Sequence, residues 1–275
     1  MEHLHFDLLT QIIIFSLLGG VLSVIAASVF LLFPEQWRNR LLPHLVSFAI
    51  GALLGAAFLA LLPHAINYAR GDVHDITFTV LIGLMAFFLL EKMVLWRHCH
   101  SDTCEAHTPE VALGEHNHQH DEGKGNPSST GAMILIGDGL HNFVDGVLIA
   151  AAFLVDPHLG IVTALAVAAH EIPQEVGDFA ILLHSGYSRT KALVFNILAS
   201  LTTLVGALLA YYSLGEAQQL LPYVLAIAAS SFIYIAVADL IPGLHKRSQL
   251  SATIQQVVLI ALGIGVIYLA HSTLH

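Results

Sequence analysis

Apolar runs extend along this chain from one end to the other. Of its 275 residues, 56% are hydrophobic and only 11% are charged, whereas an ordinary soluble domain is about 25% charged. The mean hydropathy is +0.75, and apolar stretches of about 20 residues are long enough to cross a bilayer as helices. These features exclude a soluble globular protein. They predict an all-α polytopic membrane protein with a single transmembrane domain, residues 1–275, surrounded by a lipid bilayer.

Charges, prolines and glycines divide the apolar sequence into eight predicted transmembrane helices. Their ranges are 8–33, 44–66, 76–96, 131–155, 160–183, 192–212, 220–241 and 251–271. The connections are short except for residues 97–130, which are polar, rich in histidine and predicted to be disordered. No basic segment precedes the first apolar run, so we expect that run to remain as a helix rather than to be removed as a signal peptide.

Lysine and arginine residues predict the orientation of these helices. They follow each odd-numbered helix, at Arg38, Arg40, Arg97, Lys124, Arg189, Lys191, Lys246 and Arg247. Only Arg70 lies between the second and third helices. Because cytoplasmic loops are enriched in Lys and Arg, we expect both termini to be extracytoplasmic and the loop of residues 97–130 to be cytoplasmic. The chain shows no targeting segment, so the inner (plasma) membrane of a bacterium is the expected location.

Two of the predicted helices carry many polar residues at membrane depth. They are Asp138, His141, Asn142 and Asp145 in one helix, and His170, Glu171, Gln174, Glu175 and Asp178 in the other. A charged group at the bilayer centre costs about 2.5–3.5 kcal/mol even on a lenient scale, so these groups must face one another, water or a cation. Helical spacing places His141 and Asp145 on one face of their helix, and His170 and Gln174 on one face of theirs. Facing helices would therefore bring imidazole nitrogens and carboxylate oxygens together.

This donor set suits zinc, iron(II), manganese and similar divalent ions. Interhelical hydrogen bonding is the alternative explanation for any single histidine, but it does not require so many acids. Pro173 is expected to kink its helix beside His170, because it removes one amide donor. We assign Asp138, Asp178 and Asn196 to the path of the ion, although Asn196 also fits a role in helix packing.

The predicted cytoplasmic loop contains a second set of metal-binding residue types. They are His98, Cys99, His100, Cys104, His116, His118 and His120. Histidines and thiols at this density form a soft, multidentate tract. Their spacing does not match a folded zinc finger, so we expect labile binding, with a polar linker of biased composition as the alternative. Two cysteines are too few for a disulfide framework.

Two strings of residues resemble the signatures of a known family. His141-Asn-Phe-Val-Asp-Gly146 and His170-Glu-Ile-Pro-Gln-Glu-Val-Gly-Asp-Phe179 are similar to the motifs of the fourth and fifth helices of the ZIP family of zinc and iron transporters. The resemblance is greatest to members with a His-Glu-x-Pro-His-Glu motif, and it extends over nearly the whole chain. It implies a bundle of three plus two plus three helices, often dimeric, with a binuclear metal site.

The resemblance also implies the ligands of that site. One metal would be held by His141, Asp145, His170 and Gln174, and the second by Asn142, Asp145, Glu171 and Gln174. The chain departs from the family pattern at Gln174, where histidine is expected, and at Ala56, where relatives often carry an acid.

The expected function is uptake of a divalent metal ion into the cytoplasm, with Glu171 and Glu175 available to exchange protons. Zinc is the first candidate, and iron, manganese and cadmium are further candidates. The ion is substrate, no catalytic cofactor is expected, and nucleic acid is not an expected partner. The alternative is an intramembrane zinc metalloprotease, because His-Glu-x-x-His on a helix supplies two zinc ligands and a general base. Gln174 is a poor substitute for the second histidine, and Pro173 would distort the required turn.

Overall fold

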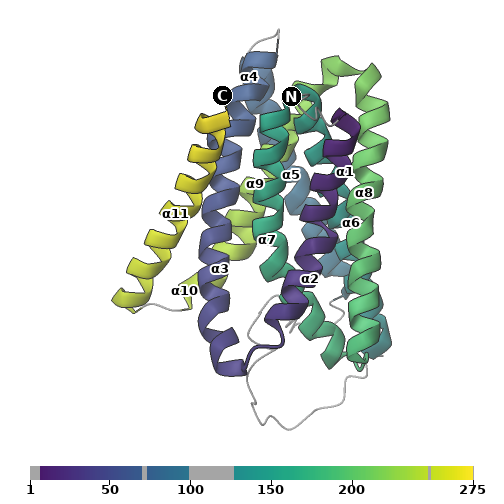
Figure 1. Cartoon of the computed structure of the whole chain (residues 1–275), viewed down its shortest axis with the longest axis vertical. Helices are drawn as coiled ribbons and strands as arrows, with labels where there is room; N and C mark the ends of the chain where they lie inside the picture. Colours follow the sequence, from purple (N-terminus) through teal and green to yellow (C-terminus); the bar gives the residue numbers. More distant parts are fainter. Residues whose placement is uncertain (1–6, 70–72, 99–126, 247–248, 275) are drawn as a thin grey trace, which may run out of the picture.

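The computed structural model describes residues 7–69, 73–98, 127–246 and 249–274. Every regular element within these ranges is a helix, and the long helices lie side by side along the long axis of the bundle (Figure 1). The α-helices are α1 (Leu8–Gly19), α2 (Val21–Phe30), α3 (Glu35–Gly55), α4 (Leu62–Tyr68), α5 (Val73–His98), α6 (Pro127–Val155), α7 (Pro157–His184), α8 (Arg189–Glu216), α9 (Leu221–Tyr234), α10 (Ile241–His245) and α11 (Leu250–Leu274). The π-helical segments are η1 (Ala56–Leu61) and η4 (Ile235–Leu240), and η3 (Gln218–Leu220) is a short 3-10 helix.

Seven helical segments in the described part of the chain are long and apolar enough to cross a membrane. This finding supports a polytopic membrane protein. The predicted span 160–183 lies within α7, which has 28 residues but is not among the seven. Its histidine, glutamine and acidic residues make it more polar than its neighbours. The start of α1 and the end of α11 lie at the same end of the bundle (Figure 1).

The boundaries of several predicted elements are wrong. The second predicted helix begins at residue 44, but α3 begins at Glu35, because a helix can continue through the polar Arg38 and Arg40 that end the apolar pattern. The predicted loop of residues 97–130 is shorter at both ends, since α5 runs to His98 and α6 begins at Pro127. The predicted loop ligands from Cys99 to His120 lie outside the described residues.

The first predicted helix is also not continuous, because α1 and α2 are separated at Gly20. The backbone there leaves the helical conformation, with φ −86° and ψ −89°. A Cβ at this position would lie 2.7 Å from the carbonyl oxygen of Ser200, so only glycine permits this close approach to α8. By contrast, α7 continues as one helix through Pro173.

Helix α7 lies at the centre of the bundle. It contacts α1, α2, α3, α6, α8 and α11, and most of the residues along its length are buried or half-buried. A polar helix in this position keeps its charged groups away from lipid, which explains how a membrane protein can contain it.

Helices α6 and α8, which both contact α7, also pack tightly against each other. A Cβ added to Gly146 of α6 would lie 1.8 Å from the carbonyl oxygen of Thr203, and one added to Gly206 of α8 would lie 2.1 Å from that of Phe143. Small residues at both crossing points let the two backbones approach each other. This contact fixes the height of α6, and therefore of its polar residues, relative to α8.

We predict that Gly146→Ala destabilises the folded protein, because the new methyl group meets backbone atoms that cannot move aside. Overpacking of this kind costs about 1–3 kcal/mol, and the melting temperature of the purified protein in detergent measures it. Gly139→Ala on the same helix is the matched control, since the nearest atom to its added Cβ would be the Thr202 methyl carbon at 3.9 Å. Equal melting temperatures for the two variants would contradict the close contact at Gly146.

Candidate metal site

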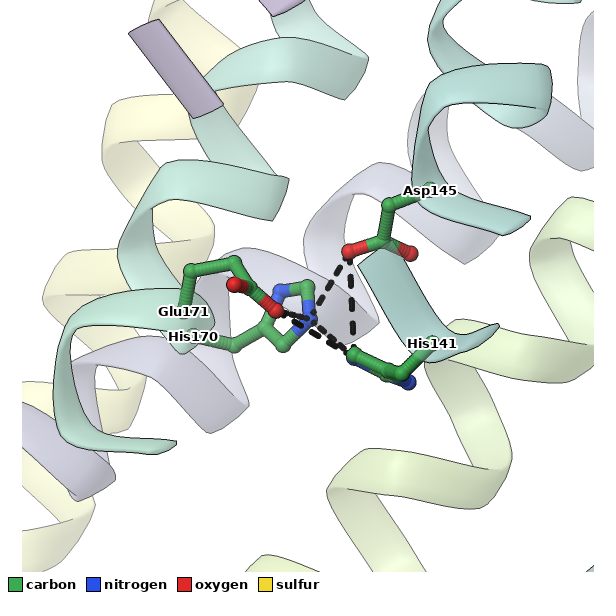
Figure 2. A group of neighbouring side chains, drawn as sticks. All are labelled: His141, Asp145, His170 and Glu171. Carbon is green, nitrogen blue, oxygen red and sulfur yellow. Dashed lines mark hydrogen bonds and ion pairs between the residues drawn. The ribbon is translucent and has the colours of Figure 1, made fainter. Parts of the chain in front are cut away.

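Four side chains of metal-binding residue types meet where α6 faces α7. His141 and Asp145 are one turn apart on α6, and His170 and Glu171 are neighbours on α7. Figure 2 shows their four functional groups pointing toward a common centre. One ligand atom from each residue lies within 4.8 Å of those from the other three.

The distances within this group are short and similar. The two Nε2 atoms of His141 and His170 are 3.2 Å apart. Oδ2 of Asp145 lies 3.8 Å from Nε2 of His141 and 3.3 Å from Nε2 of His170. Oε1 of Glu171 lies 3.3 Å from Nε2 of His141 and 3.6 Å from Nε2 of His170. Two nitrogens and two oxygens therefore surround one point.

These separations match the geometry of a tetrahedral zinc site. Zinc binds nitrogen and oxygen ligands at about 2.0–2.2 Å, so four tetrahedral ligands lie about 3.3–3.6 Å from one another. The five distances given above range from 3.2 to 3.8 Å. The group can therefore accept a zinc ion with only small movements of its side chains.

A hydrogen bond to the backbone orients the ring of His170. Its Nδ1 lies 3.1 Å from the carbonyl oxygen of Ala166. A carbonyl oxygen only accepts, so Nδ1 carries the proton and donates it to Ala166. In the neutral ring this leaves the lone pair on Nε2, the nitrogen that faces the group. Metal-binding histidines are commonly oriented by a hydrogen bond from their other ring nitrogen to a backbone oxygen.

The two acids of the group are buried without hydrogen-bond donors. Both carboxylate oxygens of Asp145 and both of Glu171 lack a hydrogen-bond partner among the described residues, and these side chains are at most 1% exposed. Burying a charge is costly unless an opposite charge balances it. Two carboxylates and two neutral imidazoles carry a formal charge of −2, which one divalent cation neutralises.

A second group of acids shares Glu171 with the first. Asp138 of α6 and Glu175 of α7 each place an oxygen within 4.8 Å of Glu171 and of each other. Both oxygens of Glu175 and Oδ2 of Asp138 are buried without a hydrogen-bond partner in the described part of the chain. A purely carboxylate group of this kind suits a hard divalent cation.

Comparison with known proteins identifies the kind of chain that carries this site. A family model described as ZIP zinc transporter matches residues 8–271. The chain belongs to the ZIP family.

Individual relatives of this ZIP chain are named zinc transporters. ZIP13 of Gallus gallus is 32% identical over 275 residues, covering 85% of this chain and 75% of that protein. ZIP13 of Homo sapiens is 32% identical over 271 residues, covering 85% and 71%. The zinc transporter zipt-7.2 of Caenorhabditis elegans is 32% identical over 269 residues, covering 83% of this chain and 58% of that protein. ZIP membership places the chain among membrane transporters and not among enzymes, so the metalloprotease alternative is excluded.

The other predicted site residues lie on α6, α7 and α8. Gln174 and Asp178 are half-buried on α7, and Asn196 is buried on α8, with no hydrogen-bond partner for its amide among the residues described. Asn142 is fully buried on α6, and both of its amide atoms are hydrogen-bonded within the protein. Roles for these four residues in holding the ion stay predictions.

Sequence reasoning missed one residue beside the site, Thr203 of α8. Its hydroxyl donates to the amide oxygen of Asn142 at 2.8 Å. A threonine within an apolar helix carries no signal of its own, and only the packing of α8 on α6 brings it to this position.

Proposed function

We propose that this chain carries zinc across a membrane into the cytoplasm through the site between α6 and α7. The observation that carries the proposal is the convergence of His141, Asp145, His170 and Glu171 at separations suited to one zinc ion. ZIP membership and the zinc transporters among the relatives support the choice of substrate. Iron, manganese and cadmium are proposed as further substrates because the acids also suit harder or larger ions.

In this proposal α7 also crosses the membrane, as the fifth of eight transmembrane helices along the chain, and the bundle has the arrangement of three plus two plus three helices. Its central position, its length and the common end reached by the start of α1 and the end of α11 support this assignment (Figure 1). The connections from α2 to α3 and from α7 to α8 lie at the opposite end of the bundle, and so does the start of α11 (Figure 1). Basic residues near these connections support a cytoplasmic location for that end and an extracytoplasmic location for both termini.

The shared position of Glu171 suggests how an ion moves through the site. The side chain of His141 is 24% exposed, whereas those of His170 and Asp145 are 1% exposed, so His141 is the member of the first group proposed to meet the ion first. An ion bound there can pass to Asp138 and Glu175 while it keeps its bond to Glu171. Four carboxylates across the two groups balance two divalent ions, and Glu171 and Glu175 are the acids proposed to exchange protons as an ion leaves. Asp178 and Asn196 are proposed to line the path beyond them.

Zinc uptake into proteoliposomes that enclose a zinc-sensitive dye tests this function. We expect saturable uptake by vesicles that contain the purified chain, and none above background by vesicles without protein. Folded, inserted protein that gives only the background rate for zinc, iron, manganese and cadmium would overturn the proposal.

Gln174→His is expected to shift the metal preference toward zinc. An imidazole nitrogen binds zinc more strongly than an amide oxygen does, and the side chain at this position lies one turn beyond His170 on α7. Apparent zinc affinity should rise relative to manganese, with slower turnover because release is harder. Competition curves for the two ions measure the change, and superimposable curves for wild type and variant would show that Gln174 is not a ligand.

Three further features belong to the proposal. The histidines and cysteines from His98 to His120 bind zinc loosely at the cytoplasmic face, and the chain forms a homodimer, as the family resemblance implies. The chain is an integral membrane protein, for which the inner membrane of a bacterium stays the predicted location. The relatives named above are animal proteins and do not test it.

A further inference from the structure

A chain of two hydrogen bonds connects α8 to the acidic group between α6 and α7. The hydroxyl of Thr203 donates to Oδ1 of Asn142 at 2.8 Å. Nδ2 of Asn142 then donates to Oδ1 of Asp138, also at 2.8 Å. Thr203 and Asn142 are fully buried and Asp138 is 6% exposed, so water does not compete for these bonds.

We propose that Thr203 is a positioning residue for the metal path, acting through Asn142 on the carboxylate of Asp138. The inference rests on the proposed function, because it assumes that Asp138 contacts the transported ion. Thr203 itself does not touch the ion. It acts together with the backbone oxygen of Asp138, which accepts from Nδ2 of Asn142 at 3.2 Å, to hold the orientation of the Asn142 amide. The amide in turn holds the carboxylate of Asp138.

The direction of each hydrogen bond supports this role. An amide has an oxygen that only accepts and a nitrogen that only donates. Because the Thr203 hydroxyl occupies the amide oxygen, the nitrogen of Asn142 faces Asp138 and can donate to it. If the amide were flipped by 180°, its oxygen would face the negatively charged carboxylate oxygen of Asp138, and the two oxygens would repel each other.

The bond to Asn142 also leaves one oxygen of Asp138 available. Oδ1 accepts from Asn142, whereas Oδ2 is buried with no hydrogen-bond partner in the described ranges. Asp138 belongs to the group of acids with Glu171 and Glu175. We call the chain of hydrogen bonds from Thr203 through Asn142 to Asp138 the relay. It holds Asp138 with one carboxylate oxygen hydrogen-bonded to the protein and the other free to bind a cation.

The packing around Thr203 fixes the start of the relay. At the break between α1 and α2, a Cβ on Gly20 would lie 2.9 Å from the Thr203 hydroxyl oxygen, and a Cβ on Gly146 would lie 1.8 Å from the Thr203 carbonyl oxygen. Two glycines thus allow two neighbouring helical segments to press against this threonine. This close packing limits the positions that its side chain can take.

Thr203→Val tests the inference, because valine keeps the branched shape of threonine and replaces the hydroxyl with a methyl group that forms no hydrogen bond. We expect the apparent KM for zinc uptake and the dissociation constant for zinc to rise about fivefold, as expected for the loss of one buried hydrogen bond. The maximal rate per folded protein should change less than the KM. Thr203→Ser, which restores the hydroxyl, should return both constants to the wild-type values.

The neighbouring Thr202 supplies a matched control. Its hydroxyl also bonds to α6, but to the backbone oxygen of Gly139 at 2.6 Å and not to a side chain of the site. Thr202→Val should therefore leave the zinc KM unchanged, whatever its effect on melting temperature. Equal zinc constants for Thr203→Val and wild type would overturn the inference, as would an equal rise in Thr202→Val or a failure of Thr203→Ser to restore binding. Absence of uptake by the wild type in the same assay would instead contradict the proposed function.

Discussion

His170→Ala is expected to abolish zinc uptake while the protein remains inserted in the membrane. The variant removes a nitrogen that lies 3.2 Å from Nε2 of His141 and 3.3 Å from Oδ2 of Asp145, at the centre of the group. Loss of a residue that merely orients a ligand costs about 10–100-fold in metal affinity, and loss of the ligand itself should cost more. Insertion should not suffer, because removing a buried polar group lowers the cost of burial in the membrane.

His184→Ala is the matched control for this prediction. His184 lies on the same helix, and its Nδ1 bonds to the backbone oxygen of Ala180, as Nδ1 of His170 bonds to Ala166. It is exposed and lies outside both ligand groups. Uptake should therefore persist in His184→Ala. A normal uptake rate in correctly inserted His170→Ala would contradict the assignment of the site.

Glu171→Gln should have an equally large effect, because Glu171 is the residue that both groups share. Glutamine keeps the size of the side chain but removes the negative charge that balances the ion. We expect the variant to lose zinc uptake and to lose bound metal from both groups. Glu175→Gln alters only the second group, so it should keep one high-affinity ion.

Metal content per folded protein, measured after equilibrium dialysis against zinc, distinguishes the two variants. The wild type should hold two ions, Glu175→Gln one, and Glu171→Gln none that is tightly bound. Glu216→Gln, a change in an exposed acid at the end of α8, controls for the loss of a charge. Equal metal content in the wild type and Glu171→Gln would show that Glu171 is not a shared ligand.

The sequence predicts the helical class and much of the candidate site because both depend on local spacing. Apolar length predicts the membrane helices, and the one-turn separation of His141 and Asp145 predicts that they share a face of α6. The break at Gly20 was not predictable in this way, since it depends on how closely α8 approaches. The position of Thr203 beside Asn142 has the same cause.

The role of Glu171 shows a second limit of spacing arguments. One-turn periodicity pairs His170 with Gln174, yet the structure places the next residue along the chain, Glu171, in the same ligand group as His170. Consecutive residues of an α-helix lie about 100° apart around its axis, yet Oε1 of Glu171 lies 3.6 Å from Nε2 of His170. Which residues of a helix reach a common ligand group therefore depends on the conformations of their side chains and on the position of the facing helix, and not on one-turn spacing alone.

The position of bound zinc shows whether the ion lies between α6 and α7. Anomalous scattering measured at the zinc absorption edge, on crystals of the protein grown with zinc, locates the ion without reference to transport. A zinc site between these helices predicts a peak about 2.0–2.2 Å from Nε2 of His141 and His170 and from carboxylate oxygens of Asp145 and Glu171. Zinc peaks elsewhere in the protein, with none between α6 and α7, would contradict it.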